Sequence, residues 1–357
     1  MRALKVVSGK RARMIWAGGT LAAGVVAFAA CFTVSSAVEQ VFGQEIAYFR
    51  IGAGAPGSTL YDLAGQIAGV ISNPPGSRQC DIDGPCGVEG IIGLAQTTTD
   101  PVDSLQSVES GQMESAIVSA DIADAAVQGT GPFKKSGSMT DLRAIANVGQ
   151  LVLHVVVAKE ARFQNIADLS GQRIAIGVKD SDNAVTAHFL LRAAGISEKK
   201  TKLITGDSDT AAQDLLDGKI DALVLVVQLP NADVAALMQT GNYRLLGGQV
   251  SDDNKSSYVI ADWIPRQQYP GADATPTLSL PAVWVVRNSL SADLANGLAK
   301  ALWHVGVKGD EPAAPGKIRL DLDRISVPLH PGAKAAFDEL RKAEGDLPAA
   351  PQATTTN

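Results

Sequence analysis

Residues 50–58 read RIGAGAPGS, and residues 173–181, RIAIGVKDS, repeat their pattern. Arginine, isoleucine, glycine and serine fall at corresponding positions of the two stretches. A second pair, SGQMESAIV at 110–118 and DGKIDALVL at 217–225, follows in the same order. One short match arises easily by chance, but two matches in the same order indicate a chain built from two similar halves.

Each half is expected to be an α/β unit. Residues 48–54, YFRIGAG, are typical of a strand followed by a turn, and 58–71, STLYDLAGQIAGVI, place apolar side chains on one helical face. VEGIIGLAQ at 88–96 and ESAIVSA at 114–120 are expected to be strands, and DSLQSVESGQ at 103–112 a helix. This alternation predicts mainly parallel sheets flanked by helices.

Two apolar stretches are expected to cross between the halves. They are LVLHVVVAKE at 151–160 and LSLPAVWVVRNSL at 278–290. The first lobe would then consist of residues 45–150 plus 283–345, with residues 151–282 inserted as the second lobe. Two crossings form a hinge of two strands, which suits the opening and closing of a cleft. The tail, 346–357, is expected to be disordered.

Composition narrows the function classes. With 357 residues the chain is long enough for one large or two ordinary domains. The formal net charge is −6, which gives no reason to propose binding to nucleic acid.

The first 37 residues predict a secretory signal peptide and export to the periplasm. Five basic residues precede an uncharged apolar run at 14–34, and small residues at Ser35 and Ala37 follow it. The run is also long enough for an uncleaved membrane anchor, and FAAC at 28–31 loosely resembles a lipoprotein acylation site. Mass spectrometry of the exported protein separates these alternatives, because cleavage predicts a mature start near Val38.

Export would place the cysteines in an oxidising compartment, where disulfides can form. Cys80 and Cys86 lie six residues apart in the Gly- and Pro-rich stretch RQCDIDGPCGVEG, and Cys31 is expected to leave with the signal. We expect a local structural disulfide between Cys80 and Cys86, with two free thiols as the alternative. The fragment from Asp81 to Gly84 lacks the later ligands of a calcium loop, so no metal is expected.

A binding site is expected where helices begin after strands, because ligands of open α/β sheets bind beyond the carboxyl ends of the strands. The two repeated loops put polar side chains and free backbone N–H groups at two helix starts, which favour a small anionic or polar solute. Later loops add further polar side chains. The candidates are Ser58, Thr59, Thr97, Thr98, Ser119, Asp121, Ser181, Asn183, Thr186 and Gln228.

Each candidate also has a purely structural interpretation. Ser58 and Ser181 are good helix caps, the threonines at 97–99 suit an ordinary loop, and Asp121 could cap the helix DIADAAV.

Features of an enzyme are missing from the sequence. GAPGS is not the G-x-S-x-G elbow of hydrolases, and no G-x-x-x-x-G-K-[ST] loop occurs. His154 lies in an apolar strand and His330 between two prolines, positions that favour structural roles. We therefore expect no catalytic residues and no cofactor.

The chain resembles the TAXI family, the substrate-binding proteins of one class of tripartite ATP-independent periplasmic (TRAP) transporters. The resemblance extends over about residues 48–340. It depends on the order of six stretches: IGAGAPGSTLYDLAGQIA, LAQTTTDPVDSLQSVESGQMESAIVSAD, HVVVAKE, FQNIADLSGQRIAIGVKDSDN, DLLDGKIDALVLV and VPLHPGA.

This resemblance implies a two-lobed periplasmic-binding-protein fold of type II, the Venus flytrap. It also implies capture of a small organic acid or amino acid, such as a glutamate-like or dicarboxylate solute, and delivery to an integral-membrane TRAP permease. It adds Gly54 and Tyr61 to the ligand-facing residues and supports all the candidates above except Gln228. The alternative function is a membrane-anchored sensory or regulatory binding protein that keeps residues 14–34.

Overall fold

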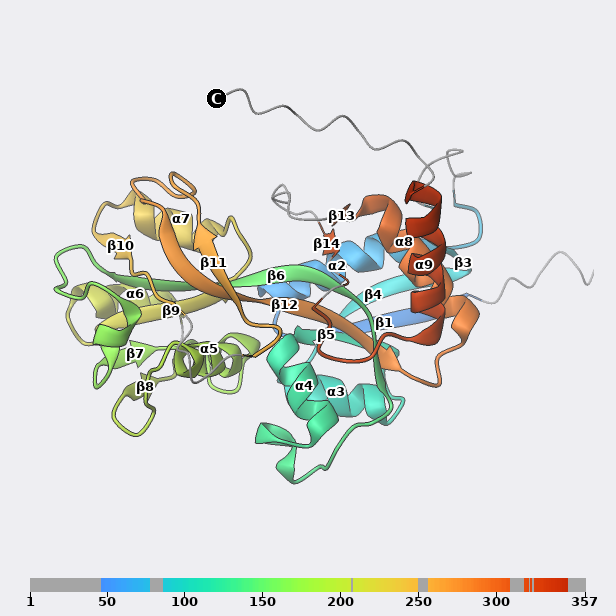
Figure 1. Ribbon diagram of the computed structural model, residues 1–357, viewed down its shortest axis with the longest axis horizontal. Coiled ribbons are helices and arrows are strands. Elements are labelled where there is room, and N and C mark those ends of the chain that lie inside the picture. Colours follow the sequence, from blue (N-terminus) through green and yellow to red (C-terminus); the bar gives the residue numbers. More distant parts are fainter. Residues whose placement is uncertain are drawn as a thin grey trace, which may run out of the picture. The chain divides into compact units, whose positions relative to one another are not determined.

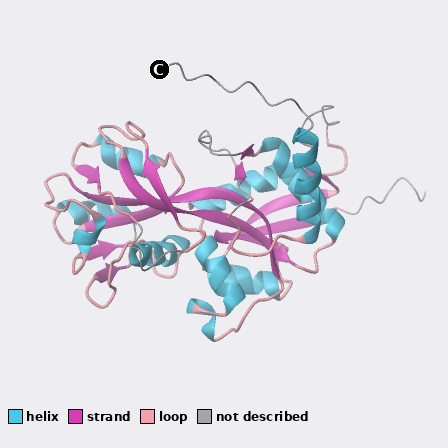
Figure 2. Cartoon of the chain, viewed as in Figure 1, coloured by secondary structure: helices cyan, strands magenta, loops and turns pink. Residues whose placement is uncertain are grey.

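A ten-stranded mixed sheet runs through the molecule (Figures 1 and 2). The strands follow the order β4-β1-β5-β12-β6-β9-β7-β8, with β10 beside β6 and β11 beside β12. The computed structural model describes residues 46–77, 86–206, 208–249, 256–308, 318–320, 322 and 324–345. All of them belong to one structural unit, Ile46–Asn357.

The first group of elements surrounds three parallel strands. It consists of β1 (Ala47–Ala53), α2 (Thr59–Ile71), β4 (Ile91–Thr97), α3 (Pro101–Glu109), β5 (Ser115–Ser119), α4 (Ala120–Gln128), the 3₁₀ helix η1 (Gly131–Lys134), α8 (Ala292–Val305) and α9 (Pro331–Gly345). Two short parallel pairs accompany it: β2 (Ser72–Asn73) with β3 (Val88–Glu89), and β13 (Val307–Lys308) with β14 (Arg319–Leu320).

The second group repeats this plan with β9, β7 and β8 as its parallel strands. It consists of the 3₁₀ helix η2 (Ile166–Leu169), β7 (Arg173–Ala175), α5 (Asp182–Ala193), β8 (Lys202–Ile204), α6 (Ser208–Leu216), β9 (Ala222–Val227), α7 (Ala232–Gln239), β10 (Tyr243–Leu245) and β11 (Ile260–Ile264).

Two long antiparallel strands, β6 (Leu142–Ala158) and β12 (Thr275–Arg287), join the groups (Figure 1). Residues 282–286 of β12 pair with β5 in the first group, whereas residues 152–156 of β6 pair with β9 in the second. The strand β6 begins well before the predicted crossing at 151–160, because its first half pairs with β12 along the first group.

The two groups have the same strand order, which explains the sequence repeat. In the first, β4-β1-β5 is followed by the antiparallel β12, and in the second, β8-β7-β9 is followed by the antiparallel β6. The predicted fold class is confirmed in its architecture: the molecule is a two-lobed α/β protein with two crossing strands. The boundaries 45–150, 151–282 and 283–345 remain our proposal for dividing it.

Helix α2 shows how local sequence builds these lobes. Its buried residues are Leu60, Leu63, Ala64, Ile67, Ala68 and Ile71, which recur with the helical period. The Ser58 side chain caps the helix by accepting a hydrogen bond from the Tyr61 N–H. The apolar stripe therefore packs on β1 and β4 while the capped end is left at the edge of the sheet.

The strand predicted at 88–96 is confirmed for residues 91–96, but residues 88–90 do not belong to it. Gly90 adopts a left-handed φ of 78° and its N–H donates to the carbonyl of Asn73, so the chain turns there. The result is a two-residue strand, β3, paired with β2, and a separate strand, β4, paired with β1.

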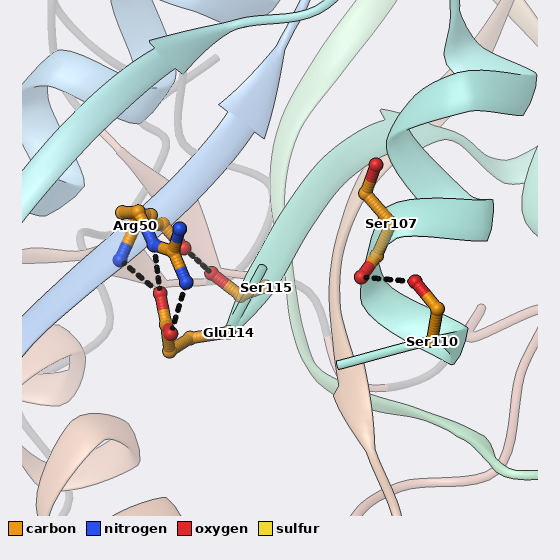
Figure 3. Close-up of polar contacts among 5 residues, drawn as sticks. All are labelled: Arg50, Ser107, Ser110, Glu114 and Ser115. Atoms are coloured by element: carbon orange, nitrogen blue, oxygen red, sulfur yellow. Dashed lines mark hydrogen bonds and ion pairs between the residues drawn. The ribbon is translucent and has the colours of Figure 1, made fainter. Parts of the chain in front are cut away.

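The repeat also places one ion pair in each half, and Figure 3 shows the pair of the first half, Arg50 with Glu114. Arg50 on β1 donates its backbone N–H, Nε and Nη2 to Glu114, at 2.9, 2.8 and 2.7 Å. Arg173 on β7 makes the same three contacts with Asp221, at 2.8, 2.9 and 2.8 Å. Each pair fixes the first strand of a half to the third, so its role is to hold the sheet together.

Glu114→Gln is expected to lower the free energy of unfolding by about 1 kcal/mol at pH 7, because it replaces a bidentate, partly exposed ion pair. Burial acts to raise the pKa of Glu114, but the hydrogen bonds from Arg50 outweigh it and the pKa is lowered. The stabilisation is therefore present at neutral pH and is lost as the pH falls through that lowered pKa.

Urea denaturation of the wild type and the variant at pH 7 and at pH 3 tests this expectation. The exposed pair Lys334–Asp338 on α9 supplies the control Asp338→Asn, which should leave the midpoint unchanged. A difference between wild type and Glu114→Gln that persists undiminished at pH 3 would contradict the assignment.

Candidate functional site

The starts of α2 and α5 face each other. Ser58 and Ser181 are the N-caps of these helices, and their Oγ atoms accept hydrogen bonds from Tyr61 N (3.3 Å) and Ala184 N (3.2 Å). A Cβ atom placed on Gly54 would lie 2.2 Å from Oδ2 of Asp182 and 3.3 Å from Oγ of Ser58. Only a glycine therefore lets the two loops approach this closely.

A hydrogen bond joins the lobes beside this contact. Ser119 Oγ, at the end of β5, lies 2.8 Å from Thr186 Oγ1 on α5, and both residues are buried. Thr186 is one turn along α5 from Asp182, so both side chains lie on the face that meets the first lobe. The two lobes therefore touch through hydroxyl groups that the sequence singles out.

Two carboxyl groups flank this hydrogen bond. Asp121, in the first turn of α4, is 6% exposed, and burial raises its pKa to about 6. Burial also raises the pKa of Asp182 to about 7, with the carboxylates of Asp100 and Asp121 adding to the effect. For each carboxyl group the loss of water outweighs the groups that stabilise the charged form, so each holds its proton more tightly.

A cavity of 760 Å³ opens between α4 and α5, next to Asp121. Its volume lies within the range of small-molecule sites. Its walls include Asp121, Asp124, Lys179, Phe189, Arg192 and Tyr258. The Phe189 and Tyr258 rings stack at 6.0 Å, and the Tyr258 hydroxyl donates to Asp124 Oδ2 at 3.3 Å.

The remaining predicted site residues have varied surroundings. Asn183 uses its amide within the second lobe, donating to the carbonyls of Ile176 and Val224 and accepting from Val226 N. Thr98 is buried against Ser104, 2.6 Å away, whereas Thr97 is exposed.

The others lie at the lobe edges. Thr59 begins α2, and Tyr61 packs partly against the core. Gln228 follows β9 and lies close to Gly149 on β6, where an added Cβ would be 2.8 Å from Nε2. Their contact with a solute stays a prediction.

Asp121 does not cap α4, because Ser119 occupies the N-cap position. The two histidines have structural partners: His154 lies 2.9 Å from both Val152 O and Tyr269 Oη, and His330 Nδ1 accepts from Gly332 N. Burial lowers the pKa of His154 to about 4, which leaves it neutral at pH 7.

Several of the earlier expectations fall outside the described residues. These are the signal or anchor at 1–37, the tail at 346–357, Cys31 and Cys80. Cys86 is disulfide-bonded, and its pairing with Cys80 stays a prediction. Within the described ranges, no helix is long and apolar enough to span a membrane, and no cluster of three or more His, Cys, Asp or Glu could hold a metal.

Sequence reasoning placed Asp182 at the start of the second-lobe helix without giving it a role in binding, and it missed the cavity wall. The repeat aligns Asp182 with Thr59, a position already chosen in the first lobe, and that alignment was the available signal. Phe189 and Arg192 lie further along α5, and Tyr258 comes from a distant loop, so no local motif brings them together.

Two similar lobes that touch at their helix starts define a two-lobed binding-protein architecture. A family model described as the NMT1-like family matches residues 51–340, and the chain belongs to this family.

Solved structures with similar folds include two sulfonate-binding proteins. The alkanesulfonate-binding protein SsuA from Xanthomonas axonopodis pv. citri is 14% identical, with a TM-score of 0.41 and 73% of each chain covered. The aliphatic sulphonate binding protein SsuA from Escherichia coli is 13% identical, with a TM-score of 0.39, covering 69% of this chain and 66% of its own.

A third is the amino acid ABC transporter substrate-binding protein AbpA from Streptococcus pneumoniae, solved with L-arginine. It is 15% identical, with a TM-score of 0.38, covering 71% of this chain and 86% of its own. At these scores the solute of this chain has to be argued from its own residues.

Proposed function

We propose that the chain is an extracytoplasmic solute receptor that binds a small polar solute between its lobes and delivers it to a membrane permease. The observation that carries this proposal is the meeting of two capped helix starts at Gly54 and Asp182, beside the Ser119–Thr186 hydrogen bond. Helix starts offer unpaired N–H groups, and the adjoining hydroxyls can donate or accept. Such a set binds a polar molecule and does not by itself catalyse a reaction.

Closure of the lobes is the proposed signal to the permease. The strands β6 and β12 are the two long connections between the lobes, so small changes in their backbone angles would rotate one lobe against the other. A solute that contacts both lobes favours the closed form only by its additional affinity for that form. The residues that join the lobes should therefore decide affinity.

For the permease we propose the TRAP type, and for the location the periplasm. The support is the order of the six sequence stretches that resemble the TAXI family. Transport should then depend on an ion gradient. In vesicles containing the permease, collapse of the sodium and proton gradients should abolish receptor-dependent uptake, and uptake that continues on ATP alone would refute this partner.

A pair of cap variants tests the site. Ser58→Ala with Ser181→Ala is expected to reduce the solute-induced rise in melting temperature by more than half, because both helix starts lose their ordering side chains. A thermal-shift screen of organic and amino acids supplies the solute. The proposed candidates are glutamate, other dicarboxylates and small aliphatic acids.

The matched control is Ser291→Ala, which removes the N-cap of α8, a hydrogen bond of 3.2 Å to Leu294 N. All the cap variants should lose roughly 1 kcal/mol of stability per cap. Only the cleft pair should also lose the response to solute. An unchanged response in the double variant would refute these site assignments.

A further inference from the structure

We infer that the solute carries a positively charged nitrogen, and that the carboxylates of Asp121 and Asp182 bind it between the lobes. This inference rests on the proposed receptor function and narrows its substrate class. The helix starts alone favour an anionic group on the solute. The inference adds that the solute must also carry a cationic nitrogen.

Asp121 is the first support. Asp121 is 6% exposed and lines the 760 Å³ cavity. Its Oδ1 atom has no hydrogen-bond partner among the described residues. Buried polar atoms are nearly always paired, because an unpaired one costs about 1–3 kcal/mol. Asp121 therefore contributes a buried, unpaired carboxylate oxygen on a residue that lines the cavity, and a donor that arrives with the solute would satisfy it.

Asp182 is the second support. It approaches the Gly54 loop of the opposite lobe, and within the described part of the chain the charged groups that act on it are the carboxylates of Asp100 and Asp121. Like charges that are brought together out of water repel each other. A cation between Asp121 and Asp182 would remove that repulsion, and it would do so only when the lobes are together.

The charged groups around Asp121 come from several elements. Its own helix supplies Asp124, α5 supplies Asp182, His188 and Arg192, and Asp100 caps α3. Arg192 lowers the pKa of Asp121, but its effect is the smallest of those acting on that carboxyl group. The guanidinium also lies 5.8 Å from the centre of the Phe189 ring. Lys134, Lys179 and Asp180 also line the cavity, whereas the charges that act on the Asp182 carboxyl group are the carboxylates of Asp100 and Asp121.

The rest of the cavity suits the body of such a solute. The stacked rings of Phe189 and Tyr258 form an apolar wall next to the carboxylates. Aromatic faces attract cations and cover methylene groups. A short alkyl chain ending in an ammonium or guanidinium group matches this combination.

Two pairs of probes test the inference, each pair sharing a carbon chain. Putrescine and succinate are four-carbon chains that end in ammonium or in carboxylate groups, and L-glutamate is glutarate with one added ammonium group. Isothermal titration calorimetry at pH 8 should show binding at least about tenfold tighter for the nitrogen-bearing member of at least one pair.

Asp121→Asn and Asp182→Asn should each weaken binding of that probe by about 10- to 100-fold, because each removes a charge-assisted hydrogen bond. The control is Asp293→Asn, which changes the exposed first-turn acid of α8 and should leave affinity unchanged. Circular dichroism spectra of all three variants show whether each one is folded.

The outcomes separate this inference from the receptor function. If succinate or glutarate binds and the nitrogen-bearing probes bind no better, the inference is overturned while the receptor function stands. If no probe binds at millimolar concentration, the inference is contradicted, and the thermal-shift screen of organic and amino acids decides the receptor function separately. A nitrogen-bearing probe that binds equally well to Asp121→Asn and Asp182→Asn also overturns the inference.

Discussion

Gly54→Ala is expected to weaken solute binding by about 10- to 100-fold, because the added methyl group would overlap the Asp182 carboxylate when the lobes meet. The Cβ atom would lie 2.2 Å from Oδ2, well inside contact distance. Gly54 does not have a left-handed φ, so alanine fits its backbone and the cost falls on closure. The association constant of the best probe, measured by calorimetry, gives the size of the effect.

Gly65→Ala is the matched control for this change. Gly65 lies within α2, and a Cβ there would meet nothing within 4 Å. The control should bind solute normally and gain about 0.5–1 kcal/mol of stability, since alanine favours a helix.

The contact partner provides a second check. In an Asp182→Ala background, Gly54→Ala should cost less than about threefold, because the two residues interact directly and their effects should not add. X-ray scattering should also show that Gly54→Ala stays more extended than the wild type with solute present. Additive effects, together with normal compaction, would mean that closure does not bring these loops together.

The strand order and the helix starts could be predicted from sequence because they depend on local patterns. Arg50 and Arg173 mark equivalent strands, and each reaches an acid at the start of the third strand of its half. Ser58 and Ser181 occupy N-cap positions that follow directly from the chemistry of serine. The repeat then fixes which loops are equivalent, without any knowledge of their distance.

The chemistry between the lobes could not be predicted in the same way. A sequence shows that Asp121 and Asp182 exist, but their pKa values depend on how much water the opposite lobe removes. Gly90 gave another failure of this kind, because its turn depends on a bond to Asn73, seventeen positions earlier. Features that depend on contacts between distant segments could thus not be predicted from the sequence.

The expectation of an anionic solute had the same origin. Isolated helix starts attract anions, and the repeat supplies two of them. In the folded chain, however, Asp182 itself brings a carboxylate to the Gly54 loop. The Asp182 carboxylate makes the site more negative than two helix starts alone would be. The pattern of capping residues in the sequence does not reveal that change in charge.

Asp121→Asn is expected to stabilise the protein without solute, by roughly 2 kcal/mol at pH 8, which would raise the melting temperature by about 4 °C. Burial raises the pKa of Asp121 to about 6, so the ionised form is disfavoured in the folded state. An amide has nearly the same shape and no charge to desolvate. The same variant should lose binding of a nitrogen-bearing solute, so stability and affinity should change in opposite directions.

The change of wild-type stability with pH follows from the raised pKa of Asp121. Since its pKa is higher when folded than the ordinary value of 3.8, Asp121 binds more protons in the folded state, and wild-type stability should fall as the pH rises from about 4 to 7. Asp182, with a pKa of about 7, should add to this fall. The Asp121→Asn variant should therefore match the wild type at pH 4 and exceed it at pH 8.

Melting curves of the two proteins between pH 4 and pH 8 measure this difference. Asp124→Asn is the control, because Asp124 lies one turn further along α4 and its carboxylate has the Tyr258 hydroxyl as a partner. That variant should not gain stability. If Asp121→Asn melts lower than the wild type at pH 8, then the Asp121 carboxylate stabilises the fold in the absence of solute. That result would contradict the proposal that it is left unpaired until a cationic solute binds.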